Sequence, residues 1–188
     1  MALHLIGRLL RGRHAGDHKL AWHHPSLSQV PETITLGSAD FANGGTMPRR
    51  HAGPGVGDNI SPELHWSGEP AGTVEWVIIL EDPDAPLPRP FVHLIAWGLP
   101  STTQALAEGD LNTKAGKGLR FGRNTFKGHG YSGPRALPGH GPHRYVFQIY
   151  ALNRRLSFSK MPDLEMMLAA MEGAVIARGR LDGLFEQV

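Results

Sequence analysis

Two histidines occupy positions from which they could act together. His93 lies within the apolar segment 91–95, and His143 directly precedes the alternating run 144–152. The acidic turn 82–86, with the sequence Asp-Pro-Asp-Ala-Pro, comes shortly before the first of them. Its prolines fix φ and lack an N–H, so the carboxylates of the turn lose little conformational entropy when they bind. If the strand ends meet at one rim of a sheet, these groups converge there.

A carboxylate beside a histidine has a definite chemical effect. If Asp82 accepts the proton of one ring nitrogen, it fixes the tautomer, leaves the other nitrogen for a ligand and favours the imidazolium form. A pair of imidazolium rings can bind phosphate, and each charge-assisted bond contributes about 1.5–3 kcal/mol. We therefore predict a small anion pocket around Asp82, His93 and His143. The alternative is that these histidines are ordinary hydrogen-bonded core residues.

Short apolar runs bounded by Gly and Pro predict the strands that position these groups. We expect strands at 33–36, 74–81, 91–98 and 144–152, because each run is too short for a typical helix and is rich in β-branched or aromatic residues. The last three should form the centre of the sheet. Two long polar stretches, 44–62 and 100–142, are predicted to be ordered loops with a functional role.

Helical spacing appears near both ends of the chain. Residues 164, 167, 168, 171 and 175 are apolar and share one helical face, with Pro162 and Asp163 before them and Gly179 beyond, which predicts a C-terminal helix over the sheet. Residues 1–30 are expected to be an N-terminal extension with a short amphipathic helix, and residues 31–188 the folded domain. The helix either docks on the body of the protein or lies on a membrane surface, and it could also serve a homodimer.

Composition excludes several function classes. The absence of cysteine excludes disulfides and thiolate sites, and it favours a cytoplasmic location. Nineteen Lys and Arg are nearly balanced by 17 Asp and Glu, which argues against nucleic-acid binding. The chain lacks both a secretory h-region and the roughly 18 apolar residues of a membrane span. No cofactor or metal site is expected, because four candidate histidines lie in separate loops: His51, His65, His129 and His140. The cluster His18, His23 and His24 lies in the connector before the first strand and is interpreted as solvated loop residues.

Three segments in this order, 59–66, 82–86 and 141–145, resemble the phosphatidylethanolamine-binding protein (PEBP) family. The likeness is to its bacterial branch, named for similarity to Raf kinase inhibitor protein, and it covers approximately residues 33–185. The resemblance implies a mainly β, Greek-key fold of two antiparallel sheets with a C-terminal helix. It also implies a small pocket that accepts phosphate, acetate or phospholipid head groups, and no catalytic reaction.

The resemblance carries ligand-binding roles to individual positions. These are Asp82, Ala85, Pro86, Phe91, His93, Tyr131, Gly133, Pro142, His143 and Tyr145. The chain departs from the family in the loop before the second histidine, where Ala136-Leu137 stands in place of the usual Pro-Pro pair. Arg144 alternates to the face opposite His143, so we expect it to be a salt-bridge or surface partner.

Three functions fit these patterns. The leading one is a binding protein without catalytic activity, which captures a phosphate, a phospholipid head group or a phosphorylated protein partner and modulates a kinase or other signalling component. The second is a hydrolase in which Asp82 and a histidine activate water on an ester or phosphoester. The third is a protein-interaction or protease-inhibitor scaffold that uses the Gly-rich loop 116–141.

Overall fold

The computed structural model describes residues 2–112 and 118–187, so two residues of the loop 116–141, Gly116 and Lys117, lie outside the described part. Two α-helices, four short 3₁₀ helices and several short strands accompany four long strands in the described residues. In chain order the elements are α1 (Ala2–Leu10), β1 (Thr35–Gly37), β2 (Gly45–Thr46), β3 (Leu64–Ser67), β4 (Glu75–Asp82), β5 (Phe91–Pro100), β6 (Ala105–Leu106), β7 (Arg120–Phe121), β8 (His143–Leu152), α2 (Leu164–Met171) and β9 (Val175–Phe185).

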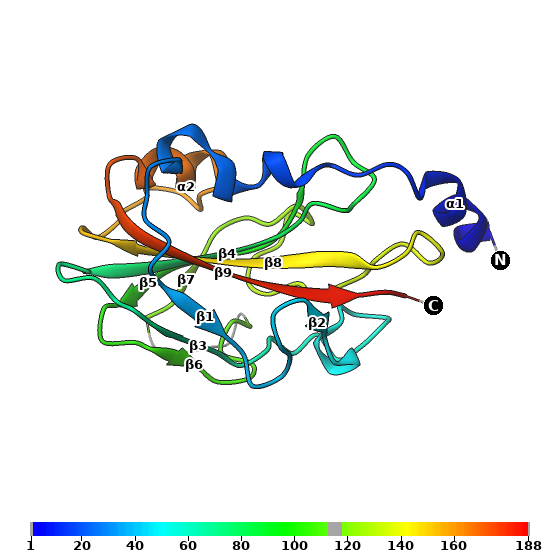
Figure 1. Ribbon diagram of the computed structural model, residues 1–188, viewed down its shortest axis with the longest axis horizontal. Coiled ribbons are helices and arrows are strands. Elements are labelled where there is room, and N and C mark those ends of the chain that lie inside the picture. The colour runs from blue at the N-terminus through cyan, green and yellow to red at the C-terminus, as the bar shows by residue number, and fades with distance from the viewer. Residues whose placement is uncertain (1, 113–117, 188) are drawn as a thin grey trace.

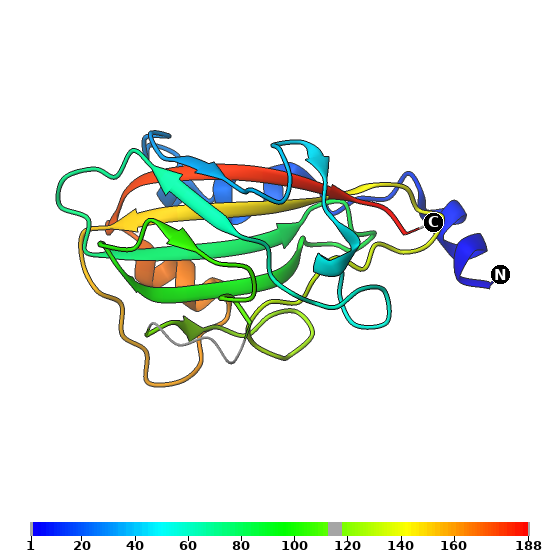
Figure 2. The same ribbon diagram turned by 90° about the horizontal axis from the view of Figure 1, so that it is seen from below.

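The described strands form two sheets. The large sheet has the order β2-β9-β8-β4-β5-β7, and the small sheet has the order β1-β3-β6. All pairs are antiparallel except β2 and β9, which run parallel. In Figure 1 the large sheet forms the middle layer, with the small sheet on one side and α2 with the N-terminal extension on the other, and Figure 2 shows the long strands side by side. The predicted mainly β fold of two sheets with a C-terminal helix is confirmed.

Strand β4 shows why the large sheet is buried on both faces. Ile78 and Leu80 pack in the core between the two sheets, whereas Val77 and Ile79 pack in the core beneath α2. A strand covered on both faces reads as a continuous apolar run, which is how the sequence identified it. β4 lies between β5 and β8, so the predicted centre of the sheet is confirmed.

The predicted C-terminal helix is too long. Its start is correct, since the Asp163 carboxylate accepts a hydrogen bond from the Met166 N–H at 3.0 Å and caps the first turn. The helix ends at Met171, and Gly173 adopts a φ of +67° that turns the chain away. Val175 therefore begins β9, a long strand missing from the prediction, which pairs with β8 along its whole length.

The N-terminal extension contacts the body in an unexpected way. Two placements were predicted for helix α1, docking on the body or lying on a membrane surface, and its apolar residues Leu3, Leu5, Ile6 and Leu9 are exposed rather than packed against the body. The helix instead approaches the body through Gly7, where a Cβ atom would lie 2.1 Å from the Pro138 carbonyl oxygen. Farther along, Leu20, Trp22 and Leu27 are buried against the large sheet. The boundary at residue 30 stays a prediction, although the extension contributes to the core before that residue.

Candidate functional site

The acidic turn after β4 fixes the carboxylate of Asp82. One of its oxygens, Oδ1, accepts backbone N–H groups from Asp84 at 2.8 Å and Ala85 at 3.0 Å. This is an Asx-type turn, in which the side chain of the first residue replaces the backbone partner of the next residues. Asp82 is buried, and its second oxygen remains available for a neighbour.

That neighbour is His143, the first residue of β8. Its Nδ1 lies 2.8 Å from Asp82 Oδ2, and both side chains are almost fully buried. β4 ends where β8 begins because the two strands are antiparallel neighbours, so the two residues meet at one end of the large sheet. The predicted carboxylate–histidine contact is therefore present in the structure.

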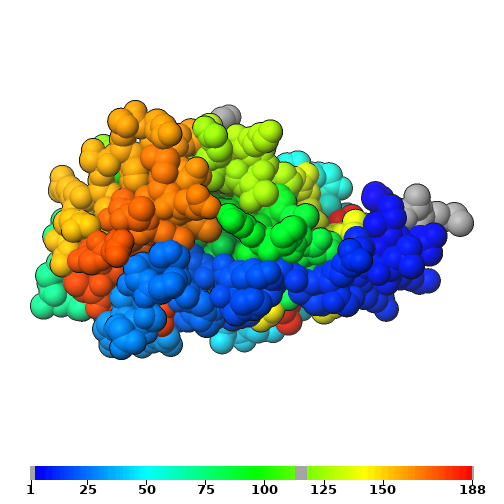
Figure 3. Space-filling model, turned by 90° about the horizontal axis from the view of Figure 1, so that it is seen from above, coloured from blue at the N-terminus to red at the C-terminus, as the bar shows by residue number. Residues whose placement is uncertain are grey.

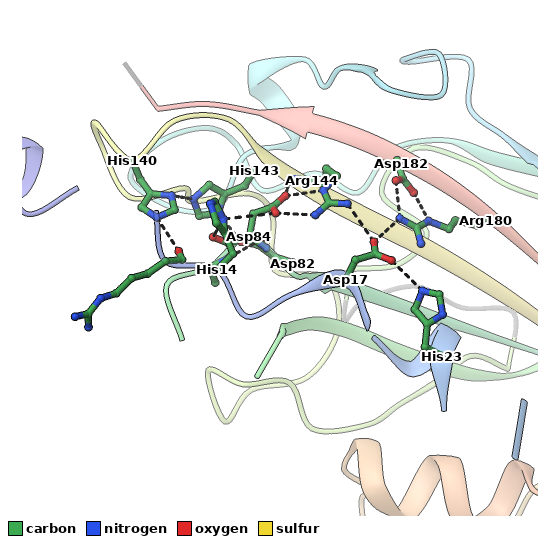
Figure 4. Close-up of polar contacts among 12 residues, drawn as sticks. His14, Asp17, His23, Asp82, Asp84, His140, His143, Arg144, Arg180 and Asp182 are labelled. Atoms are coloured by element: carbon green, nitrogen blue, oxygen red, sulfur yellow. Dashed lines mark hydrogen bonds and ion pairs between the residues drawn. The ribbon is translucent and has the colours of Figure 1, made fainter. Parts of the chain in front are cut away.

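The other ring nitrogen of His143 is not free, contrary to expectation. Its Nε2 lies 2.8 Å from Nδ1 of His140, a residue that the sequence analysis placed in a separate loop (Figure 4). Nε2 of His140 in turn contacts the backbone carbonyl oxygens of Leu10 at 2.9 Å and Arg13 at 3.1 Å. The only sequence signal for this contact was the spacing of three residues between the histidines.

The hydrogen-bond pattern determines how many protons the two rings share. Carbonyl and carboxylate oxygens only accept, so Nε2 of His140 and Nδ1 of His143 both carry hydrogen. One further proton lies between the facing nitrogens, which gives the pair one positive charge opposite Asp82. Burial lowers the pKa of His140, so His140 is the neutral partner and His143 carries the charge.

His93 reaches the same end of the sheet through a β-bulge in β5. Leu80 pairs with Leu94 and Glu81 pairs with Val92, which leaves His93 as the extra residue. The bulge turns its ring onto Tyr145, with the ring centroids 5.1 Å apart. The bulge places His93 and Leu94 on the same face of the strand, which strict alternation would not do. The sequence therefore could not show the orientation of the His93 ring.

His93 differs from His143 in its charge. Burial lowers the pKa of His93, and its Nδ1 lies 2.6 Å from the Ser132 carbonyl oxygen, to which it must donate. In the neutral ring Nε2 is therefore an acceptor, and none of the described residues donates to it. The expected pair of imidazolium rings is wrong for His93. The site combines one cationic ring, at His143, with one neutral ring.

The aromatic wall of the site lies beside His93. The ring of Phe91 is 5.1 Å from His93 and 4.5 Å from Phe126, and the guanidinium of Arg135 lies over Phe126 at 4.2 Å. The hydroxyl of Tyr145 accepts the Arg135 backbone N–H at 3.2 Å. Phe91 and Tyr145 are thus brought to the site as predicted, and Phe126 was missed because it lies in a polar loop.

The remaining predicted residues have other contacts. The hydroxyl of Tyr131 donates to the His51 carbonyl oxygen at 2.8 Å, within the core between the sheets. Gly133 approaches the same carbonyl so closely that a Cβ atom would lie 2.0 Å from it. Both residues therefore hold the loop in place rather than contact Asp82 or His143. Pro142 is exposed, and Pro86 is half-buried at the edge of the acidic turn.

Ala85 and Pro83 bind the N-terminal extension through their backbone. Their carbonyl oxygens accept the N–H groups of Ala15 and Gly16, both at 2.9 Å. Together with the contacts to His140, these bonds lay residues 10–16 across the acidic turn. We call this segment the N-terminal strap.

Arg144 fastens the acidic turn from the opposite face of β8. Its Nε and Nη2 each lie 2.8 Å from an oxygen of Asp84, and its Nη1 lies 3.1 Å from Asp17 (Figure 4). Burial raises the pKa of Asp84, but the hydrogen bonds from Arg144 outweigh this effect and lower it. Arg180 also contacts Asp17, at 3.0 Å. The predicted ion-pair role of Arg144 is confirmed.

Metal-binding clusters and membrane-spanning helices are both absent from the described part of the chain. Residues 2–112 and 118–187 contain no cluster of His, Asp and Glu side chains suited to a metal ion. Within the same residues, neither helix has the length and apolar character needed to cross a membrane.

Comparison with known proteins identifies the family. The family model described as phosphatidylethanolamine-binding protein matches residues 37–186. A UPF0098 protein of Aquifex aeolicus is 33% identical over 80% of this chain and 86% of its own length. The chain therefore belongs to the phosphatidylethanolamine-binding protein family, and this match agrees with the expected bacterial branch.

Solved structures support the same assignment. The crystal structure of a PEBP homologue from Chlamydia trachomatis is similar with a TM-score of 0.74 and 33% identity, covering 84% of this chain and 99% of that one. Escherichia coli YbcL, described as a member of the mammalian PEBP family, has a TM-score of 0.77 at 27% identity, covering 83% of this chain and 99% of its own.

Proposed function

We propose that the chain is a binding protein, not an enzyme, which captures a protonated phosphoryl group between His143 and His93. The observation that carries this proposal is the pair of facing nitrogens at 2.8 Å, because His143 presents an N–H there to an acceptor. A phosphoryl oxygen is a stronger acceptor than the nitrogen of a neutral histidine, and it brings negative charge to a cationic ring.

The neutral state of His93 restricts the kind of ligand that fits the site. Its Nε2 accepts, so it pairs with an O–H rather than with a bare oxyanion. A phosphate monoester that retains one proton supplies both an oxyanion for His143 and a hydroxyl for His93. Free phosphate and phosphoethanolamine share this chemistry, whereas the phosphodiester of an intact phospholipid has no hydroxyl to donate and would pair with His143 alone.

His140 must withdraw before such a ligand can bind. It occupies the acceptor position opposite His143 and is held there by the carbonyl groups of Leu10 and Arg13. Binding is therefore expected to be coupled to a shift of the N-terminal strap. Removing the imidazole of His140 should strengthen binding, because the ligand then has no protein group to displace.

The hydrolase alternative finds less support. His143 is the histidine that contacts Asp82, and both of its nitrogens are engaged as donors, so it has no free lone pair to act as a general base. The free lone pair in the site belongs to His93, whose ring hydrogen-bonds the Ser132 carbonyl oxygen rather than Asp82. The scaffold alternative depends on the loop 116–141, part of which lies outside the described residues. We therefore retain both as outcomes of the test.

The test is histidine ¹⁵N NMR of wild type, His140→Ala, His93→Ala and His143→Ala during titration with phosphate and phosphoethanolamine. We expect saturable shifts of the His93 and His143 ring nitrogens. Loss of the His143 donor should weaken binding about ten- to a hundred-fold, the equivalent of one charge-assisted hydrogen bond. His140→Ala should bind more tightly than wild type.

His65→Ala is the matched control, because the ring of this exposed histidine on β3 hydrogen-bonds only the Glu63 carboxylate among the described residues. Binding should be unchanged in this variant. An absence of shifts in both wild type and His140→Ala would exclude the anion site. Turnover of p-nitrophenyl phosphate that disappears in His143→Ala would instead establish the hydrolase.

A further inference from the structure

A cavity lies on the face of the large sheet that α2 covers. It has a volume of about 720 Å³ and lies between α2, the N-terminal extension and the turn that follows Asp84. Figure 3 shows the hollow between these segments. Its apolar lining includes Leu20, Leu87, Val92, Leu164 and Leu168. A cavity of this size and character is suited to a small organic ligand.

A fully buried acidic side chain, Glu81, borders this apolar space. Glu81 is 1% exposed, and its Oε2 accepts hydrogen bonds from the Ala21 N–H and from Gln148 Nε2, both at 2.8 Å. Its Oε1 is buried and has no hydrogen-bond partner within the described residues. A buried polar atom without a partner is costly, and it is therefore a reason to look for a ligand.

We propose that this cavity binds an uncharged, largely apolar alcohol whose hydroxyl group hydrogen-bonds Oε1 of Glu81. The cavity walls supply the apolar contacts, and Glu81 supplies the polar contact that orients the molecule. Glu81 and Asp82 are consecutive residues of a strand and point to opposite faces, so this site is separate from the one at His143.

A hydroxyl is the group that suits both protonation states of Glu81. Burial raises the pKa of Glu81 to about 7, so both forms occur near neutral pH. Because Oε2 already accepts two N–H groups, the acidic proton resides on Oε1. An alcohol can accept from Oε1–H in the neutral form and donate to Oε1 in the ionised form, whereas an ether can only accept.

The charges at the mouth favour an uncharged ligand. Lys19 Nζ donates to the Pro88 carbonyl oxygen at 3.1 Å, and Arg89 forms an ion pair with Glu165 at 2.9 Å. Both cations lining the cavity are thus already engaged, and an anionic ligand end would have to displace one of these contacts.

The experiment compares 1-decanol with its methyl ether as probes of the wild-type protein at pH 8, where Glu81 is ionised. The methyl NMR signals of Leu164 and Leu168 and the carboxyl ¹³C signal of Glu81 report binding. We expect saturable shifts with the alcohol. The affinity for the ether should be at least about ten-fold lower than the affinity for the alcohol, since the ether cannot donate to Oε1. The ring signals of His93 and His143 should not move.

Two variants locate the probe without disturbing the core. Leu87→Asn changes a cavity residue that is 43% exposed, and Met161→Asn changes a residue outside the cavity lining that is 41% exposed. The first should weaken decanol binding, and the second should leave it unchanged. Equal affinity for alcohol and ether, the absence of saturable shifts, or binding that is insensitive to Leu87→Asn would each overturn the proposal.

Discussion

Nε2 of His143 and Nδ1 of His140 face each other at 2.8 Å across the end of the large sheet, so the family's second histidine is held by a residue of its own loop. His140 in turn contacts the carbonyl groups of the N-terminal strap. The ligand site and the strap are therefore linked through a single side chain, and changes in either should be measurable in the other.

Gly7→Ala should loosen the strap from a distance. Alanine normally favours a helix over glycine by about 1 kcal/mol, but here its Cβ would lie 2.1 Å from the Pro138 carbonyl oxygen. A Cβ atom at Gly12 would have no neighbouring atom within 4 Å, so Gly12→Ala is the matched control. We expect faster hydrogen exchange and tryptic cleavage near Arg11 and tighter phosphate binding in Gly7→Ala only. Equal protection in the two variants would contradict this prediction.

The affinity for phosphoethanolamine should rise at acidic pH through His140. Burial lowers the pKa of His140, so this ring gains its second proton only below the usual histidine range, and it then repels His143 and His14 instead of accepting a hydrogen bond. Comparing wild type with His140→Ala at each pH cancels the titration of the ligand itself. Calorimetry should show the ratio of the two affinities approaching one as the pH falls from 7.5 to 5.

Glu81 should make the wild-type protein less stable as the pH rises. Its folded pKa of about 7 lies above the ordinary value of 4.5, so the folded state holds the proton more tightly than the unfolded state. The stability that this proton confers is complete below pH 4.5 and is lost as the pH rises through 7, a change of about 3 kcal/mol. Urea denaturation of wild type and Glu81→Gln at pH 4.5, 6 and 8 measures it. The free energy of unfolding of Glu81→Gln should rise relative to that of wild type as the pH increases. A difference that stays constant with pH would refute the assignment.

Asp84→Asn should weaken the attachment of the acidic turn to β8. The variant loses the ion pair with Arg144, which we expect to cost about 1–2 kcal/mol of unfolding free energy, less than a fully buried pair because Arg144 is partly exposed. The pKa of Asp84 is lowered, so its contribution is present above the usual aspartate range and disappears as the pH falls through the folded pKa. The exposed Asp58→Asn is the control. The urea midpoints of the two variants should differ at pH 7, and this difference should become smaller at pH 3.

The sequence predicted those parts of the fold in which local pattern and tertiary packing agree. β4 and β5 are largely continuous apolar runs and β8 alternates at period two, and each was predicted. β9 was missed because Gly179, Gly183 and two arginines interrupt its pattern, while Val175 happens to continue the helical spacing of Met171. Its strand conformation depends on pairing with β8, which no local signal reports.

The site was predictable to the level of residue type but not of hydrogen bonding. The acidic turn and the two histidines converge as expected, because they lie at matching ends of antiparallel strands. The orientation of the His93 ring depends on a bulge. The hydrogen bond at Nε2 of His143 depends on His140, which contacts the N-terminal strap more than a hundred residues away in sequence. Such contacts arise from chain packing, so residue types and spacing alone did not contain them.

The parallel pair of β2 and β9 has a consequence for how the chain is made. β9 follows every other described strand along the chain, yet it lies inside the large sheet between β8 and β2. During synthesis β8 leaves the ribosome with one edge unpaired, and β2 has no sheet to join until β9 emerges. The nascent chain therefore exposes a long strand edge until β9 has emerged, and premature termination before residue 175 is expected to give an aggregating product.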